Sequence, residues 1–78
     1  MIQKKISYRP LWDILESRSL PYSYLCYNDI GLHITTRSLA RMRQDQGVSI
    51  ETLLRVCAIL DVNLGDICET ITIKTNDE

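Results

Sequence analysis

Residues 50–60 carry the feature that most restricts the fold, a broad apolar face at helical spacing. Its members, at three- and four-residue intervals, are Ile50, Leu53, Leu54, Val56, Cys57 and Leu60. A helix with so wide an apolar face is stable only when other elements surround it. The chain has 78 residues, and a chain of that size buries only about 60% of its unfolded surface. We therefore expect one domain over residues 1–78, with a core at about 8–69, an N-terminal arm and a C-terminal strand and tail.

Start and stop signals place four further helices around this central one. Pro10 suits the first turn of a helix, and the apolar spacing after it predicts a helix from Pro10 to Arg18. Pro21 repeats the signal and predicts a helix of about two turns. Thr35 is a predicted N-cap for a helix over Thr36–Asp45 that ends at Gly47. Further on, Ser49 caps the central helix, and Asn63 caps a short one over residues 64–68.

The remaining segments are a turn and the two ends of the chain. Residues 28–34 read as a turn, in which Ile30, Leu32 and Ile34 can pack underneath. Residues 70–74 alternate with β-branched side chains and predict a short strand before a polar tail at 76–78. Residues 2–8 alternate weakly, which leaves a strand and an ordered arm both open. The expected class is therefore all-α, a compact five-helix domain with the option of short strands at both ends.

The net charge of −1 conceals a polarised chain. Residues 1–48 hold seven lysines and arginines against four acidic residues, whereas residues 49–78 hold two against six. Near-neutrality argues against strong unspecific adhesion to nucleic acid.

The sequence also indicates the compartment. No apolar run approaches the roughly 20 residues of a membrane span, and no signal-peptide core is present, so we expect a cytoplasmic protein. Cys26, Cys57 and Cys68 lack a C-x-x-C pair and are interpreted as reduced apolar residues.

The helix predicted over Thr36–Asp45 carries the clearest functional pattern. Leu39 and Met42 point to one side, while the opposite side holds Thr36, Arg37, Ala40, Arg41 and Gln44 without a carboxylate. Arginine can bind guanine edges with two parallel hydrogen bonds, glutamine can do the same with adenine, and alanine leaves room beside a thymine methyl. Arg43 lies off this stripe, where a phosphate contact is expected. A solvated helix face is the alternative.

The order of the elements favours contact with DNA. A short helix, a turn and a second helix that carries the base-reading residues form a helix-turn-helix layout. Residues 35–43, 48–53 and 56–67, together with Tyr8-x-Pro10-Leu11-Trp12, resemble the Cro/CI-type helix-turn-helix regulators of bacteria and phages. The resemblance covers about residues 8–69. It implies a sequence-specific regulator, most simply a repressor, whose third helix enters the major groove of double-stranded DNA.

The resemblance also implies the residues that contact DNA. They are Thr35, Thr36, Arg37, Ala40, Arg41, Arg43, Gln44 and Tyr22, with Arg43 on the backbone and Tyr22 divided between packing and a phosphate contact. Two departures stand out. The turn at 28–34 is two or three residues longer than the family's usual connection, and Pro21 and Tyr22 replace the Ser or Gln that often begins the second helix. We also expect Lys4, Lys5 or Arg9 beside the third helix, forming one basic face.

Other chemistry has little support in the sequence. His33 has no cysteine or carboxylate partners at metal-ligand spacing, the serines lack a triad arrangement, and the three glycines stand singly. We expect no enzyme, no cofactor, no metal, and no small-molecule ligand.

A small domain makes few phosphate contacts, so we expect a homodimer. It could form through the Ile59 side of the helix at 50–60, or through the Ile71/Ile73 strand, which could instead pair with the arm of its own chain. The alternative function is a protein-interaction module on the same scaffold, such as an antitoxin-like or adaptor subunit. The longer turn and the near-neutral charge motivate it.

Overall fold

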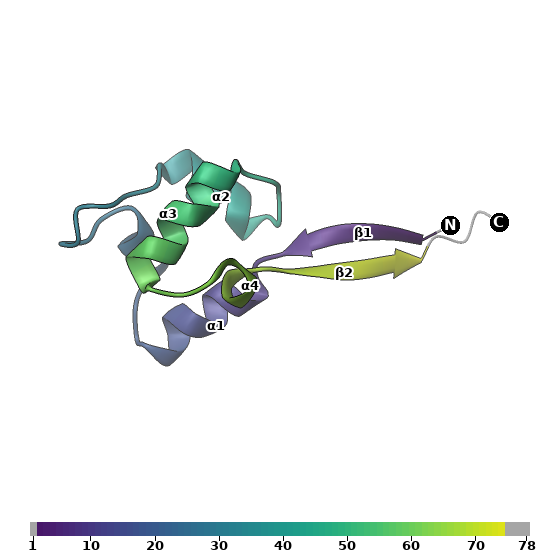
Figure 1. The fold of residues 1–78 in the computed structure, drawn as a ribbon, viewed down its shortest axis with the longest axis horizontal. Helices are drawn as coiled ribbons and strands as arrows, with labels where there is room; N and C mark the ends of the chain where they lie inside the picture. The colour runs from purple at the N-terminus through teal and green to yellow at the C-terminus, as the bar shows by residue number, and fades with distance from the viewer. Residues whose placement is uncertain (1, 75–78) are drawn as a thin grey trace.

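The computed structural model describes residues 2–74, which form a helical body and a projecting two-stranded ribbon (Figure 1). The elements in chain order are β1 (Ile2–Ser7), α1 (Arg9–Ser17), η1 (Tyr22–Leu25, a 3-10 turn), α2 (Thr36–Arg43), α3 (Ile50–Leu60), α4 (Leu64–Ile67) and β2 (Glu69–Lys74). The predicted tail at 76–78 lies outside the described residues.

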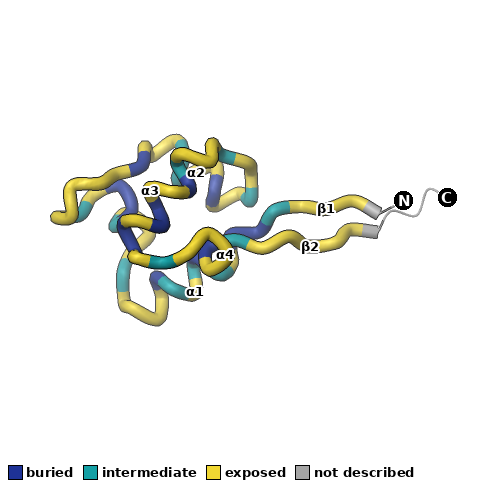
Figure 2. The backbone as a smooth tube through the Cα atoms, viewed as in Figure 1, coloured by how far each residue is buried: buried dark blue, intermediate teal, exposed yellow. Residues whose placement is uncertain are grey.

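The core lies between α3 and the helices around it, and it includes four of the six residues predicted for the apolar face of α3, whereas Ile50 and Leu54 are exposed. Leu53, Val56 and Leu60 of α3 are buried, and so are Leu11 and Leu15 of α1. Figure 2 shows that the buried stretches gather in the helical body, whereas the far part of the ribbon is exposed. The side chains of Thr35 and Ser49 accept backbone N–H bonds from Ser38 and Thr52 at 3.0 and 3.2 Å. Both predicted caps are therefore confirmed.

The predicted count of five helices is wrong. The described residues contain four α-helices and a short sheet, because the segment after Pro21 makes only one 3-10 turn, Tyr22–Leu25. The amide nitrogen of Asn28 donates to the carbonyl oxygens of Tyr24 and Leu32 at 2.8 and 2.9 Å, and so occupies the end of that turn. An Asn side chain that binds local carbonyls competes with helix propagation. The fold is mostly helical with a small sheet.

The two terminal segments pair with each other. β1 and β2 are antiparallel, with Lys4 opposite Thr72 and Lys5 opposite Ile71, and the Lys4 ammonium donates to the Thr72 hydroxyl at 2.9 Å. Of the possibilities left open for these ends, the structure shows strands within one chain. The ribbon extends from the body along the longest dimension of the molecule, 51 Å (Figure 1).

Tyr8, between β1 and α1, is hydrogen-bonded to the segment that follows α2. Its side chain is fully buried, its hydroxyl donates to the Gln46 carbonyl oxygen at 3.0 Å, and its backbone N–H donates to Asp45 Oδ1 at 3.2 Å. Asp45 adopts the left-handed conformation, with φ of 56°, that was predicted for Gly47. As a result α2 ends at Arg43, two residues earlier than predicted, because Asp45 and not glycine makes the turn.

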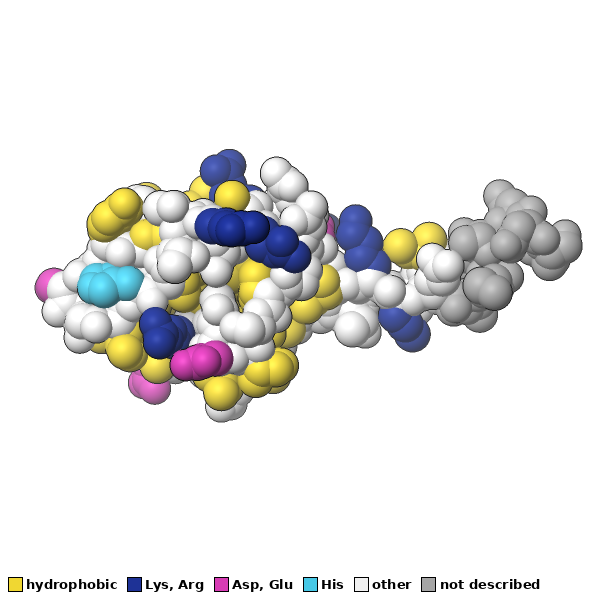
Figure 3. Space-filling model, turned by 90° about the horizontal axis from the view of Figure 1, so that it is seen from above, with side chains coloured by type: hydrophobic (Ala, Val, Ile, Leu, Met, Phe, Trp, Pro, Cys, Tyr) yellow, Lys and Arg dark blue, Asp and Glu magenta, His cyan; other side chains and the backbone are white. Residues whose placement is uncertain are grey.

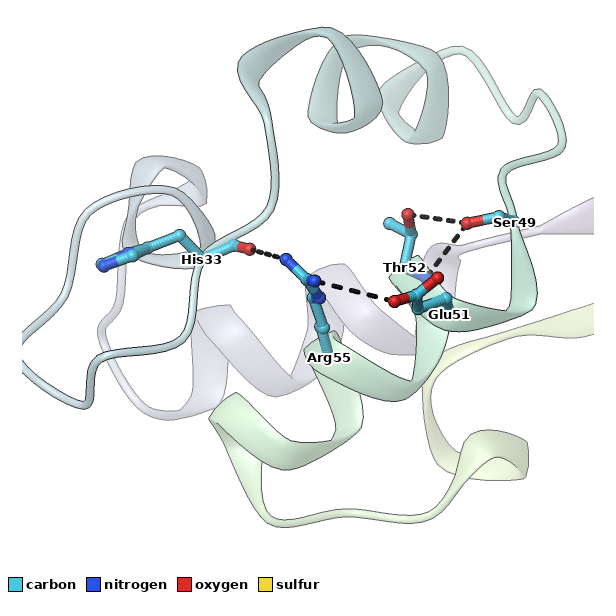
Figure 4. A network of polar contacts seen from close by, with 5 residues as sticks. All are labelled: His33, Ser49, Glu51, Thr52 and Arg55. Carbon is cyan, nitrogen blue, oxygen red and sulfur yellow. Dashed lines mark hydrogen bonds and ion pairs between the residues drawn. The ribbon is translucent and has the colours of Figure 1, made fainter.

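The turn at 28–34 is less buried than the sequence suggested. Ile34 is buried, but Ile30 and Leu32 are exposed, so the prediction that all three pack beneath the turn is wrong. Asn28 Oδ1 accepts the Ile30 N–H at 2.8 Å, which makes a local turn that needs no core beneath it. Figure 4 shows that Arg55 of α3 holds this turn through the His33 carbonyl oxygen at 3.4 Å.

Ile59 was one of two candidate dimer contacts, and the structure rules it out as an exposed surface. Its side chain is 4% exposed and belongs to the core of the monomer. The exposed apolar residues of α3 are instead Ile50 and Leu54. The other candidate, the β2 strand, leaves Ile71 and Ile73 exposed.

Among the described helices, none is long and apolar enough to cross a membrane.

Burial of acidic hydroxyl and thiol groups predicts a loss of stability at alkaline pH. Burial raises the pKa of Tyr8 from 10.0, with Cys68 and Asp45 adding to the effect, and burial raises the pKa of Cys26, Cys57 and Cys68 from 9.0. Each group then holds its proton more tightly in the folded protein than in the unfolded one. Its contribution to stability is therefore complete below the ordinary pKa and is lost as pH rises through the raised pKa.

The free energy of unfolding, measured by urea titrations at a series of pH values under reducing conditions, should fall above pH 9. Tyr8→Phe should make the fall shallower near pH 10 and cost about 0.5–1.5 kcal/mol at neutral pH for the lost hydrogen bond. An unchanged alkaline slope would contradict the assignment.

Candidate nucleic-acid interface

The exposed side of α2 has a defined order of side chains. Met42 is buried, Ser38 and Leu39 are half-buried, and the rest of the helix faces solvent. At about 100° per residue, Thr36, Arg37, Ala40 and Gln44 occupy the middle of the exposed arc, and Arg41 and Arg43 lie at its two edges. We call these six residues the α2 face. The face carries three cations and no carboxylate.

Arg41 lies at the edge of the α2 face that is nearer to α3. Its Nε donates to the Gly47 carbonyl oxygen at 3.1 Å, which directs the guanidinium toward the α2–α3 connection. A guanidinium has five N–H donors, so four remain for another partner. Arg37 and Arg41 line a shallow cleft of about 420 Å³, together with Ser38, Gly47, Val48, Ser49 and Thr52.

Ser49 and Thr52 belong to the site although neither was predicted to contact DNA. They stand at the start of α3, 12 and 15 residues after Arg37, and the fold brings them into the same cleft as that arginine. The hydroxyls of Ser49 and Thr52 lie 3.0 Å apart (Figure 4). Free N–H groups at a helix start favour anions. The one sequence feature that could have pointed to these residues is the predicted N-cap at Ser49. Its position beside α2 depends on the tertiary fold, which the sequence does not display.

Arg43, at the opposite edge of the α2 face, stacks on Tyr22. The guanidinium carbon of Arg43 lies 4.7 Å from the centre of the Tyr22 ring. Tyr22 in turn contacts Trp12 of α1, with 5.0 Å between the ring centres and 60° between the ring planes. The structure shows Tyr22 in packing contacts, and because its side chain is still 42% exposed, the phosphate contact stays a prediction. The stack fixes where the end of α2 lies relative to η1.

The two lysines of β1 do not share one face of the ribbon. Strand alternation puts Lys4 and Lys5 on opposite faces of the ribbon, so they do not join α2 as one surface. Figure 3, which looks down on the side of α2, shows basic side chains gathered on the helical body and separate basic side chains on the two sides of the ribbon. The expectation that Lys4, Lys5 or Arg9 lies beside the third helix stays a prediction, although Lys4 and Lys5 cannot share one face of the ribbon. The local charge of the site comes from the three arginines.

Metal-binding chemistry has no cluster to support it in the part of the chain that the structure describes. No group of three His, Cys, Asp or Glu residues is placed there to hold an ion. His33 is exposed in the turn, and its carbonyl oxygen, not its ring, makes the contact with Arg55.

The hydroxyl of Thr35, another predicted DNA contact, is used in the cap of α2. It accepts the Ser38 N–H and donates to the Ser38 hydroxyl, each at 3.0 Å.

A short helical turn, a connection and a second helix with an exposed basic face define a helix-turn-helix domain. The comparison with protein families agrees and is more specific. The chain belongs to the Cro/C1-type helix-turn-helix DNA-binding domain family, whose model matches residues 1–72.

Among solved structures, the chain is similar to the crystal structure of the transcriptional regulator VanUg. The TM-score is 0.76 at 26% sequence identity, and the match covers 87% of each chain. No curated protein sequence matches the chain significantly.

Proposed function

We propose that this protein is a sequence-specific DNA-binding regulator of transcription that inserts α2 into the major groove. The single observation that carries the proposal is the α2 face, an exposed surface with arginines at both edges, polar side chains between them and no carboxylate. Family membership and the similarity to a transcriptional regulator support it. Repression is the simplest mode, since a domain of this size can block a promoter by occupying it. The proposal requires binding alone and assigns the protein no catalytic step.

The geometry divides the roles within the α2 face. Arg37 and Gln44 lie centrally, with side chains long enough to hydrogen-bond base edges. Thr36 and Ala40 lie between them and suit close apolar or hydroxyl contact with a base. We expect Thr35 to contribute mainly through its cap, which fixes the first turn of α2.

Arg41 has a different role from the base-reading one implied by the sequence. Its contact with the Gly47 carbonyl oxygen directs it toward the cleft at the start of α3. A phosphate there would meet Arg41, the hydroxyls of Ser49 and Thr52, and the positive end of the α3 dipole. Arg43 and Tyr22 would hold a phosphate on the opposite wall of the groove. The two edges of the α2 face would then contact the phosphates of the two strands of one duplex.

The phosphate role of Arg43 predicts a change in salt dependence. Arg43→Ala should weaken binding to specific and unrelated duplexes by similar factors, and it should reduce the slope of log affinity against log salt by about 1. Fluorescence anisotropy at a series of salt concentrations measures both quantities. A loss confined to one base position of the specific site would contradict the phosphate assignment and indicate base reading.

Dimerisation belongs to the same proposal. One α2 face contacts a single half-site, and two-fold dimers on palindromic sites double the number of contacts at a spacing of about one helical turn. We therefore propose that the functional unit on double-stranded DNA is a homodimer.

The exposed turn gives a second candidate function, a protein-interaction module. Tyr27, Ile30 and Leu32 project from the connection between η1 and α2, with exposed fractions of 71%, 47% and 39%. Such a cluster fits a protein partner better than a phosphate backbone. Absence of salt-sensitive binding to any duplex would favour this function over the first.

A further inference from the structure

The ribbon of β1 and β2 projects from the helical body with both faces and both edges open (Figures 1 and 2). An isolated two-stranded ribbon is marginally stable in water. One face of this ribbon carries Ile71 and Ile73, which remain 41% and 38% exposed. Lys5 lies directly opposite Ile71 on the same face. We propose that this face, the isoleucine face of the ribbon, packs against the same face of a second copy of the chain.

Charge indicates which face of the ribbon is used. The other face presents the Lys4 ammonium bonded to the Thr72 hydroxyl at 2.9 Å. That face also carries Thr70 and Thr72, so it offers less exposed apolar surface for a second copy, and its ammonium group already has a polar partner. On the isoleucine face, the single cation is long and flexible, so its stem can cover apolar surface while its charge stays in water.

The position of α2 favours face packing over edge pairing. In Figure 1 the strands lie side by side in the plane of the picture, and α2 lies on the upper side of the body. Edge pairing uses a two-fold axis perpendicular to the sheet, which would turn the second α2 face to the opposite side. Face packing about a two-fold axis that runs parallel to the sheet and across the strands leaves both α2 faces on the same side, whereas an axis along the strands would not. Only the second arrangement lets both copies contact one duplex.

The size of the interface predicts where the dimer forms. Two partly exposed isoleucines per copy bury far less than the roughly 800 Å² per partner of a standard interface. The free protein should be mostly monomeric at micromolar concentration. Two copies on adjacent half-sites are held at an effective concentration that reaches the millimolar range, where a weak contact becomes productive. The inference rests on the proposed function, because DNA brings the two copies together.

The test compares a full palindromic duplex with a single half-site, both taken from a sequence recovered by selection from a random pool. The wild-type chain should bind the full site cooperatively. Ile71→Thr/Ile73→Thr keeps β-branched residues in β2 and should lose at least about tenfold of the cooperative affinity while half-site affinity stays unchanged. Ile50→Gln/Leu54→Gln, which changes the two most exposed apolar residues of α3, is the matched control and should keep cooperativity.

Each outcome separates the inference from the proposed function. Cooperativity that survives in the ribbon variant, or that is lost only in the α3 variant, would overturn the inference while DNA binding stands. If the wild-type chain binds no duplex selectively, the proposed function itself fails. Amide spectra of the ribbon variant report whether the helical body stays folded. A variant with lost cooperativity and an intact body supports the ribbon contact.

Discussion

Replacing Arg37 and Arg41 together by alanine should weaken binding to the specific duplex by roughly 100-fold or more. A good bidentate arginine–base contact discriminates by about 1–3 kcal/mol, and the second change removes a phosphate contact beside it. Both side chains are exposed and α2 keeps its cap and its buried Met42, so the fold should remain. Anisotropy titrations measure the affinity, and far-UV circular dichroism measures the helicity.

Single changes divide this effect into its two parts. Arg37→Ala should relax the preference for one base in each half-site, whereas Arg41→Ala should lower affinity for all sequences alike. Arg55→Ala is the control for charge, because it removes the same charge from an exposed residue of α3 whose ion pair with Glu51 is a surface one. It also removes the 3.4 Å hydrogen bond to the His33 carbonyl oxygen, so amide spectra should first show that the turn at 28–34 is unchanged. If Arg55→Ala weakened binding as much as Arg37→Ala, the effect would be one of net charge and not of the α2 face.

Met42→Ala should destabilise the protein by about 2–5 kcal/mol. Met42 is the one fully buried side chain of α2, so it anchors that helix to the core. A loss of this size is a large share of the about 5–15 kcal/mol that stabilises a typical protein. DNA binding should fall with the folded fraction, even though no residue of the α2 face has changed. Urea unfolding curves give the free energy of unfolding.

Met42→Leu conserves volume and should cost less than about 1.5 kcal/mol, with DNA binding retained. The pair of variants thereby separates cavity formation from any special property of the thioether. Equally large losses in both variants would indicate a special property of the thioether, and equally small losses would indicate that another residue, such as the half-buried Leu39, anchors α2.

Local signals accounted for much of the helical body. Proline in the first turn placed α1 within one residue of its observed bounds, and the apolar spacing of α3 identified the central helix. Thr35 and Ser49 cap their helices as predicted, because a cap bond joins residues only three positions apart. These features depend on neighbours in sequence, which a single chain displays directly.

The errors came from contacts between distant segments. The pairing of Lys4 with Thr72 joins residues 68 positions apart, and alternation alone could not choose among a strand, an arm and an intermolecular contact. Ile59 lies opposite the main apolar side of α3, yet it is buried because other elements cover that side as well. The 3-10 turn at η1 is an exception, because the Asn28 side chain that bonds the Tyr24 and Leu32 carbonyl oxygens is a local competitor with the helix.

For the candidate site too, local features were predicted from the sequence and tertiary contacts were not. Helical geometry alone predicted five of the six residues of the α2 face and placed the sixth, Arg43, off the stripe. It did not predict that Arg41 would turn toward Gly47, that Arg43 would stack on Tyr22, or that Ser49 and Thr52 would border the same cleft. The net charge of −1 therefore says little about the site, because the proposed function depends on three arginines at one surface and not on the total charge.

Selection of bound duplexes from a random pool, repeated at several salt concentrations, tests the central claim most directly. The account predicts a palindrome whose half-sites lie about one helical turn apart and whose preferred bases persist as salt rises, since base contacts carry the specificity. Recovery of no consensus, with binding that disappears uniformly as salt increases, would contradict sequence reading by the α2 face.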